Sequence, residues 1–170
     1  MCEPEVVITL VLGGARSGKS RHAERVATRL RPPVTYLATA VIDDGDADHV
    51  ARIAAHRARR DPAWTTVEAG AGLTSALRRL TGSVLVDSLG TWVAAHDGFA
   101  VDVDELCKAL SVRDGDTVVV SEEVGFGVHP SSDAGRRFRD VLGNVNVAVA
   151  DVADDVVLVI AGRVVPLERT

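Results

Sequence analysis

A glycine-rich octet, GGARSGKS, occupies residues 13–20 and directly follows a run of apolar residues. It fits the pattern G-x-x-x-x-G-K-[ST] in full, and the residues after it have helical periodicity. Glycines let the backbone wrap closely around an anion, so that several N–H groups and a helix N-terminus point at phosphate. In this pattern Lys19 reaches the outer phosphates and the Ser20 hydroxyl coordinates Mg²⁺. The octet therefore predicts a nucleoside triphosphate site whose contacts are Gly13, Gly14, Ala15, Arg16, Ser17, Gly18, Lys19 and Ser20.

A carboxylate at the end of a neighbouring strand is expected to hold the Mg²⁺ through water. Asp87 ends the apolar run Val84–Asp87 and is the first candidate. Glu123, which follows the run Thr117–Ser121, is the alternative.

Asp87 also opens a D-x-x-G tetrad, residues 87–90, which occurs in GTP-dependent switch proteins. Such proteins normally read guanine with an N/T-K-x-D segment late in the chain. This sequence has none, because its two lysines are Lys19 and Lys108. The pattern therefore disfavours a regulatory switch.

A second cationic cluster lies on a predicted helix that begins near Asp48 and ends at about Arg60. Arg52, His56 and Arg60 have i, i+4, i+8 spacing and share one face, and two further arginines flank them. Neighbouring positive charge disfavours a protonated histidine, and a neutral imidazole can attack phosphorus while arginines neutralise the phosphates. The charge pattern alone is also typical of an ordinary solvated basic face, so both interpretations stay open at this point.

These groups need a scaffold, and five short apolar runs are predicted to be its strands. They are Val6–Leu12, Val34–Ala40, Val84–Asp87, Thr117–Ser121 and Val156–Ile160. Besides the basic segment, helical periodicity marks Gly18–Leu30, Leu73–Leu80, Val103–Leu110 and Asp133–Ala150. This alternation predicts a single α/β domain over residues 1–170, a P-loop NTPase (RecA-like) domain with a mostly parallel sheet flanked by helices. Ligands of such sheets bind beyond the carboxyl ends of the strands.

The overall charge limits the partners. A net charge of −5 and a pI of about 5.5 disfavour nucleic acid, which binds to basic faces. Cys2 and Cys107 are too few for a disulfide framework and suit a reducing cytoplasm. The apolar run at residues 6–12 is too short for a membrane span. We expect a cytoplasmic protein without a membrane span.

Several longer segments resemble one known family, the bifunctional adenosylcobinamide kinase / adenosylcobinamide-phosphate guanylyltransferase of cobalamin biosynthesis. They occur in family order and reach nearly from end to end. The segments are GGARSGKSRHAE (13–24), YLATA (36–40), ARIAAHRARR with a later W-x-T-x-E (51–68), VLVDSLGTWV (84–93), SEEVGFGVHP (121–130) and FRDVLGNVN (138–146).

The resemblance implies two reactions in a homotrimeric enzyme. ATP or GTP phosphorylates the aminopropanol hydroxyl of adenosylcobinamide. A histidine then attacks the α-phosphorus of GTP, releases pyrophosphate and passes GMP to adenosylcobinamide phosphate, giving adenosyl-GDP-cobinamide. By its place in the motif that histidine is His56, and the resemblance decides the open question about the basic helix in favour of chemistry.

The resemblance also assigns nucleotide contacts beyond the octet. Glu68 is a candidate to accept hydrogen bonds from guanine N1–H and N2–H₂, which would explain base recognition without N-K-x-D. The metal ligands implied are Ser20 and Asp87. The full set of implied contacts outside the octet is Ala38, Thr39, Ala40, Arg57, Ala58, Arg59, Arg60, Glu68 and Asp87.

Two positions depart from the family pattern. Asp87 stands where members carry glutamate, and Glu122 stands where some carry asparagine before E-V-G. Two rival functions remain, a small-molecule kinase without the guanylyl step and a non-enzymatic nucleotide-binding switch.

Overall fold

The computed structural model describes residues 6–40, 54, 57, 58 and 60–169. Within them, seven strands form one sheet in the order β3-β2-β4-β5-β1-β6-β7. Every neighbouring pair from β3 to β6 is parallel, and β7 runs antiparallel to β6. The strands are β1 (Ile8–Gly13), β2 (Val34–Ala38), β3 (Thr65–Glu68), β4 (Ser83–Asp87), β5 (Thr117–Glu122), β6 (Asp155–Ile160) and β7 (Arg163–Pro166).

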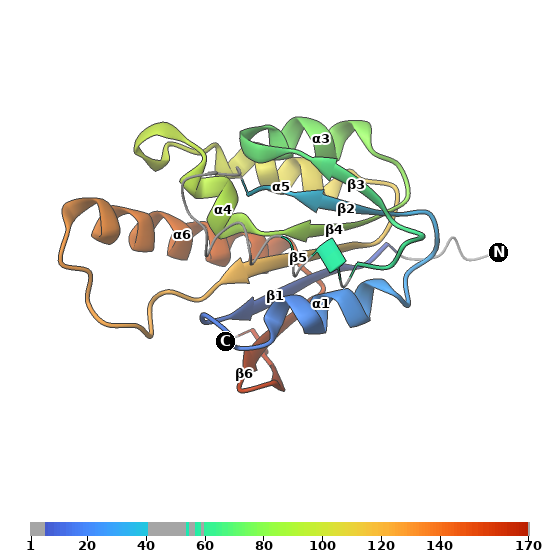
Figure 1. Cartoon of the computed structure of the whole chain (residues 1–170). Coiled ribbons are helices and arrows are strands. Elements are labelled where there is room, and N and C mark those ends of the chain that lie inside the picture. Colours follow the sequence, from blue (N-terminus) through green and yellow to red (C-terminus); the bar gives the residue numbers. More distant parts are fainter. Residues whose placement is uncertain (1–5, 41–53, 55–56, 59, 170) are drawn as a thin grey trace.

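Helices cover both faces of this sheet (Figure 1). One face carries α1, and the other carries α3, α4, α5 and α6. The helices are α1 (Lys19–Ala27), α3 (Leu73–Arg79), α4 (Leu89–Ala94), α5 (Val103–Ser111) and α6 (Asp133–Val152), with 3₁₀ turns η1 (Gly70–Gly72) and η2 (Asp97–Phe99). No helix of the described residues is long and apolar enough to cross a membrane.

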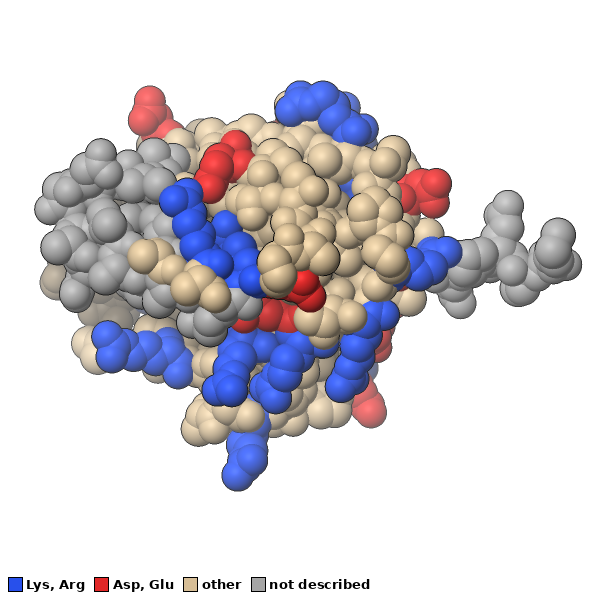
Figure 2. Space-filling view, turned by 45° about the vertical axis from the view of Figure 1, so that its right-hand side comes forward, with Lys and Arg blue, Asp and Glu red and all other residues tan. Residues whose placement is uncertain are grey.

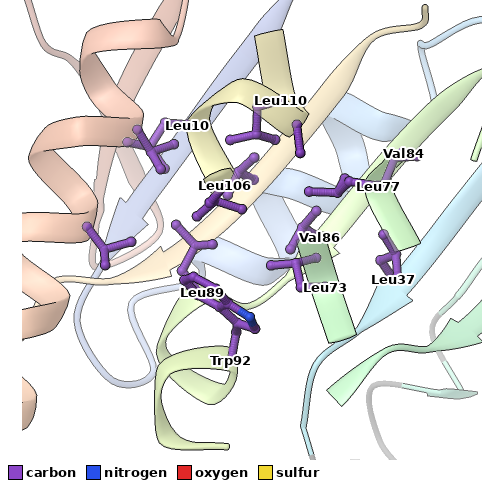
Figure 3. Close-up of a cluster of buried hydrophobic side chains, with 14 of the residues drawn as sticks. Leu10, Leu37, Leu73, Leu77, Val84, Val86, Leu89, Trp92, Leu106 and Leu110 are labelled. Atoms are coloured by element: carbon purple, nitrogen blue, oxygen red, sulfur yellow. The ribbon is translucent and has the colours of Figure 1, made fainter. Parts of the chain in front are cut away.

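The alternation of side chains along β1 divides the core between these two layers. Leu10 and Leu12 point into the larger cluster, while Val11 between them packs with the smaller cluster on the α1 face. Figure 3 shows Leu10, Leu106 and Leu110 converging in the larger cluster, with Trp92 at its other end. Because both faces of the central strands are covered, these strands read as continuous apolar runs.

The parallel register brings the candidate chemical groups to one edge of the sheet. Gly13 at the end of β1 pairs with Glu122 of β5. Ala38 at the end of β2 lies between Asp87 of β4 and Glu68 of β3. The carboxyl ends of five adjacent strands therefore carry a glycine loop and three carboxylates in a row.

All five predicted strands are present, and the predicted helices at residues 18–30, 73–80, 103–110 and 133–150 agree with α1, α3, α5 and α6 within a few residues. Strands β3 and β7 were not predicted, because their side chains are mostly exposed and give no apolar run. Helix α4 was also missed, since six residues are too few to show a period. Most of the basic helix predicted from Asp48 lies outside the described residues.

Replacing Leu10 by alanine should lower the free energy of unfolding by about 2–5 kcal/mol, because a fully buried leucine leaves a cavity between β1 and the helices. Urea denaturation followed by circular dichroism measures the change. The control is Val147→Ala on α6, whose side chain is 65% exposed and which should shift the free energy by no more than about 0.5 kcal/mol. Equal shifts for the two variants would contradict the core described above.

Candidate functional site

The octet 13–20 forms a tight loop between β1 and α1. Arg16 and Gly18 have positive φ angles of 56° and 96°, and Gly18 is the N-cap of α1. A Cβ added at Gly13 would lie 2.4 Å from Ser17 Oγ and 2.8 Å from the Val159 carbonyl oxygen. The close approach of the chain to itself therefore requires glycine at position 13, as the phosphate-loop pattern predicts.

Strands β6 and β7 support the loop from outside. The N–H of Gly162, in the turn between these strands, donates to the Ser17 carbonyl oxygen at 2.8 Å. The Lys19 N–H donates to Ser17 Oγ at 3.3 Å. These two hydrogen bonds hold the loop in shape at the start of α1.

The side chain of Lys19 lies along the loop and is only 11% exposed. Its Nζ donates to the Gly14 carbonyl oxygen at 3.3 Å and lies 3.7 Å from Glu122 Oε1. The ammonium group is therefore placed at the phosphate end of the loop, between the loop backbone and the end of β5.

Glu122 is a site residue that the sequence reasoning missed as a functional candidate. Its carboxylate accepts hydrogen bonds from Ser88 Oγ at 2.9 and 3.0 Å and from the Gly90 N–H at 3.0 Å. Glu123, the alternative metal residue, instead accepts from the Gly125 N–H at 2.7 Å in the following loop. No local pattern in the sequence marks this role of Glu122. It depends on the strand order, in which β5 and not β4 lies next to β1.

Asp87 is at the sheet edge as predicted, two strands away from β1. Its Oδ2 accepts a hydrogen bond from the Tyr36 hydroxyl at 2.5 Å. Burial, followed by the negative charge of Asp87 and this bond, raises the pKa of Tyr36 above its usual value, so the hydroxyl stays a donor. The Arg60 guanidinium lies 3.7 Å from the centre of the Tyr36 ring.

Thr39 has a fully buried side chain. Its Oγ1 donates to the Ser88 carbonyl oxygen at 2.6 Å and accepts from the Ser88 N–H at 2.8 Å. In the predicted nucleotide segment Ala38–Ala40, the threonine side chain therefore joins β2 to the β4–α4 turn.

The part of the basic segment that the structure describes lies beside β3 and β2. Arg57 Nη2 donates to Glu68 Oε1 at 2.8 Å, and both side chains are about half exposed. Arg60 Nη1 donates to Thr66 Oγ1 at 3.3 Å. Ala58 is exposed beside them, whereas His56 and Arg59 lie outside the described residues.

Basic side chains gather on the side of the molecule that carries α1 (Figure 2). Arg21 and Arg25 of α1, and Arg29 just after this helix, are exposed. Burial, then Arg25 and Arg29, lowers the pKa of His22 on the same helix. Although the chain is acidic overall, its phosphate loop lies beside a local positive field, which attracts anions.

Among the described residues, no group of three or more His, Cys, Asp or Glu side chains could hold a metal ion. Of the two predicted metal ligands, Asp87 ends β4 and Ser20 lies in the first turn of α1.

Comparisons with known proteins show which family the chain is similar to. The model of the family described as cobinamide kinase / cobinamide phosphate guanyltransferase matches residues 9–167. The bifunctional adenosylcobalamin biosynthesis protein CobP of Pseudomonas aeruginosa is 38% identical over 168 residues, which cover 94% of this chain and 96% of that protein. The bifunctional adenosylcobalamin biosynthesis protein CobU of Escherichia coli K12 is 33% identical over an alignment of 179 positions, which covers 92% of this chain and 97% of that protein.

A solved structure confirms the predicted fold class. An ATPase from the type III secretion system of pathogenic bacteria superposes with a TM-score of 0.52 at 11% identity, over 89% of this chain and 50% of that one. The chain spans about half the length of that structure, and the likeness concerns the fold alone.

Replacing Gly13 by alanine should weaken nucleotide binding about 5- to 150-fold, because the added methyl group costs about 1–3 kcal/mol of loop strain against Val159 and Ser17. Titration with a fluorescent nucleotide analogue measures the dissociation constant. Gly143→Ala on α6, where a Cβ meets no atom within 4 Å, is the matched control and should bind as the unaltered chain does. Unchanged affinity in the Gly13 variant would contradict this account of the loop.

Proposed function

This chain belongs to the cobinamide kinase / cobinamide phosphate guanyltransferase family, and from that premise we propose how its site divides the two activities. The observation that carries the proposal is the formed phosphate loop with Lys19 at the same sheet edge as Glu68, Asp87 and Glu122. Both reactions start from a nucleoside triphosphate, so one loop serves both.

In the kinase reaction the loop holds the β- and γ-phosphates of ATP or GTP. Lys19 and Arg16 offset the charge on these phosphates. The aminopropanol hydroxyl of adenosylcobinamide attacks the γ-phosphorus, an O–P bond forms, and the bond to the bridging oxygen breaks to release the nucleoside diphosphate. Positioning and electrostatics supply most of the catalysis in such transfers.

In the guanylyl reaction His56 attacks the α-phosphorus of GTP. An N–P bond forms, the bond to the bridging oxygen breaks, and pyrophosphate leaves. The phosphate of adenosylcobinamide phosphate then attacks the same phosphorus, the N–P bond breaks, and adenosyl-GDP-cobinamide forms. Arg57 and Arg60, which lie beside β3 and β2, support this assignment, because guanidinium groups can offset the charge on an α-phosphate.

We assign guanine recognition to Glu68. It lies at the end of β3 and already accepts a hydrogen bond from Arg57. A carboxylate can accept from guanine N1–H and N2–H₂ together, whereas adenine offers no such pair of donors.

The donor set also fits Mg²⁺. Magnesium keeps several waters and binds through one or two protein oxygens together with substrate phosphates. Ser20 and Asp87 are oxygen donors of this kind, and the ion would offset the charge of the phosphates.

A homotrimer and a cytoplasmic location complete the proposal. Exposed apolar side chains on the β6–β7 hairpin support contact between copies, namely Ile160, Val164, Val165 and Leu167. The free thiol of Cys107 suits a reducing compartment. The substrates proposed are small molecules.

Incubation with α-labelled GTP and Mg²⁺, followed by denaturation, should leave a label on the chain that is labile in acid and stable in base, as a phosphoramidate is. His56→Ala should abolish this label and retain the kinase reaction, because the γ-phosphate transfer does not use the imidazole. Lys19→Ala should lower both activities.

The outcomes separate this proposal from its rivals. A labelled His56→Ala chain would remove the histidine from the mechanism. Phosphorylation of the corrinoid without any label on the unaltered chain would leave a kinase alone. Nucleotide binding without transfer in either assay would leave a binding switch.

Glu68→Gln should reduce the preference for GTP over inosine triphosphate, which lacks the N2 amino group. A lost hydrogen bond to a charged acceptor is worth about 1.5–3 kcal/mol, so labelling efficiency with GTP should fall about 10- to 150-fold. Relative kcat/KM values for the two nucleotides measure the effect. Glu105→Gln on α5, paired only with surface cations in the structure described, is the control, and an unchanged preference in the Glu68 variant would refute the assignment.

A further inference from the structure

The carboxylate of Glu122 has two differently placed oxygens. Oε2 accepts from the Gly90 N–H at 3.0 Å and from Ser88 Oγ at 3.0 Å. Oε1 faces the phosphate loop, 3.7 Å from Lys19 Nζ, with Ser88 Oγ 2.9 Å away on the other side. Both oxygens thus contact the β4–α4 turn, and Oε1 also lies beside the cation that binds the outer phosphates.

The residues around Glu122 pack closely against it and hold its backbone. A Cβ added at Gly90 would lie 2.1 Å from Glu122 Oε2, so the backbone of the turn comes closer than any side chain would permit. Below the glutamate, Asn146 of α6 donates to its carbonyl oxygen at 3.1 Å and contacts Ser121 Oγ at 2.6 Å. The end of β5 is therefore held by α6 and by the β4–α4 turn.

The two rival carboxylates are placed differently. Asp87 accepts from the buried hydroxyl of Tyr36 and ends a strand that does not touch β1. Glu123 turns into the loop after β5 and accepts from Gly125. Glu122 Oε1, by contrast, lies 3.7 Å from Lys19 Nζ at the phosphate loop.

We propose that in this chain Glu122, which stands where some family members carry asparagine, is a catalytic residue that orients the acceptor hydroxyl of the kinase reaction and takes its proton; this inference rests on the proposed function. A carboxylate in this role must lie beside the γ-phosphoryl group and reach the hydroxyl that attacks it. Oε1 meets the first condition through Lys19. The side chain of Glu122 is 29% exposed, so the attacking hydroxyl can approach it from the edge of the sheet.

The step balances within the groups named. The hydroxyl oxygen forms a bond to the γ-phosphorus, and the bond from that phosphorus to the bridging oxygen breaks. The electron pair of the broken bond leaves with the nucleoside diphosphate. The hydroxyl proton passes to Glu122 Oε1. The guanylyl reaction needs no such acceptor, because its attacking groups, an imidazole and a phosphate, carry no proton on the attacking atom.

The test compares both reactions in the full-length Glu122→Gln variant. Glutamine keeps the shape of the side chain but accepts no proton. We expect kcat for phosphate transfer from γ-labelled nucleotide to adenosylcobinamide to fall about 10²- to 10⁴-fold, with the nucleotide KM unchanged or lower. Labelling of the chain by α-labelled GTP should stay within about threefold of the unaltered chain.

Gly90→Ala provides a second perturbation that removes no ionisable group from the chain. The added methyl group must displace the carboxylate, so phosphate transfer should fall while chain labelling persists. Circular dichroism confirms that both variants are folded. Glu105→Gln serves as the matched control on α5 and should alter neither reaction.

Three results would overturn the inference. The first is unchanged phosphate transfer in Glu122→Gln, and the second is a loss confined to a Glu123→Gln variant. The third is an equal fall in both reactions of Glu122→Gln, which would show that the glutamate only supports the loop. If the unaltered chain neither phosphorylates the corrinoid nor takes up label, the proposed function fails, and that result is distinct from these three.

Discussion

The parallel pairing of β1 with β5 and β6 is the constraint on which the site depends. It fixes Gly13 opposite Glu122 on one side, and it brings the Val159 carbonyl oxygen so close on the other that position 13 has no room for a side chain. Lys19, the first residue of α1, then lies between the phosphate loop and the end of β5. The apolar layers on both faces hold this pairing, so the core also positions the phosphate site.

Three carboxylates lie close to one edge of the sheet, in a chain that is acidic overall. Each carboxylate at the sheet edge has a donor of its own: Arg57 for Glu68, Tyr36 for Asp87, and Ser88 with Gly90 for Glu122. Carboxylates held in this way keep fixed orientations beside a loop that must accept triphosphate. The basic residues of α1 supply a local field of the opposite sign, and net charge alone would not have indicated it.

The sequence predicted what local patterns determine. The octet, the five apolar strands and the fold class follow from spacing and periodicity, which neighbouring residues set. The place of Glu122 could not be predicted in this way, because it depends on β5 lying between β1 and β4, a fact of tertiary pairing. Nor could the buried role of Thr39 or the contact of Arg60 with Tyr36, since each joins segments that are far apart in sequence. His56 lies outside the described residues, and its role remains a prediction.

The strand order suggests why one phosphate loop can serve two reactions without interference. Arg57 and Arg60, which we assign to guanylyl transfer, lie beside β3 and β2, whereas Glu122 ends β5, two strands away from β2. At about 4.8 Å per strand, that separation is about 10 Å, which is comparable to the screening length in physiological salt. The proposed proton acceptor near β1 and the arginines near β3 are therefore far enough apart for each group to retain the charge that its own step requires.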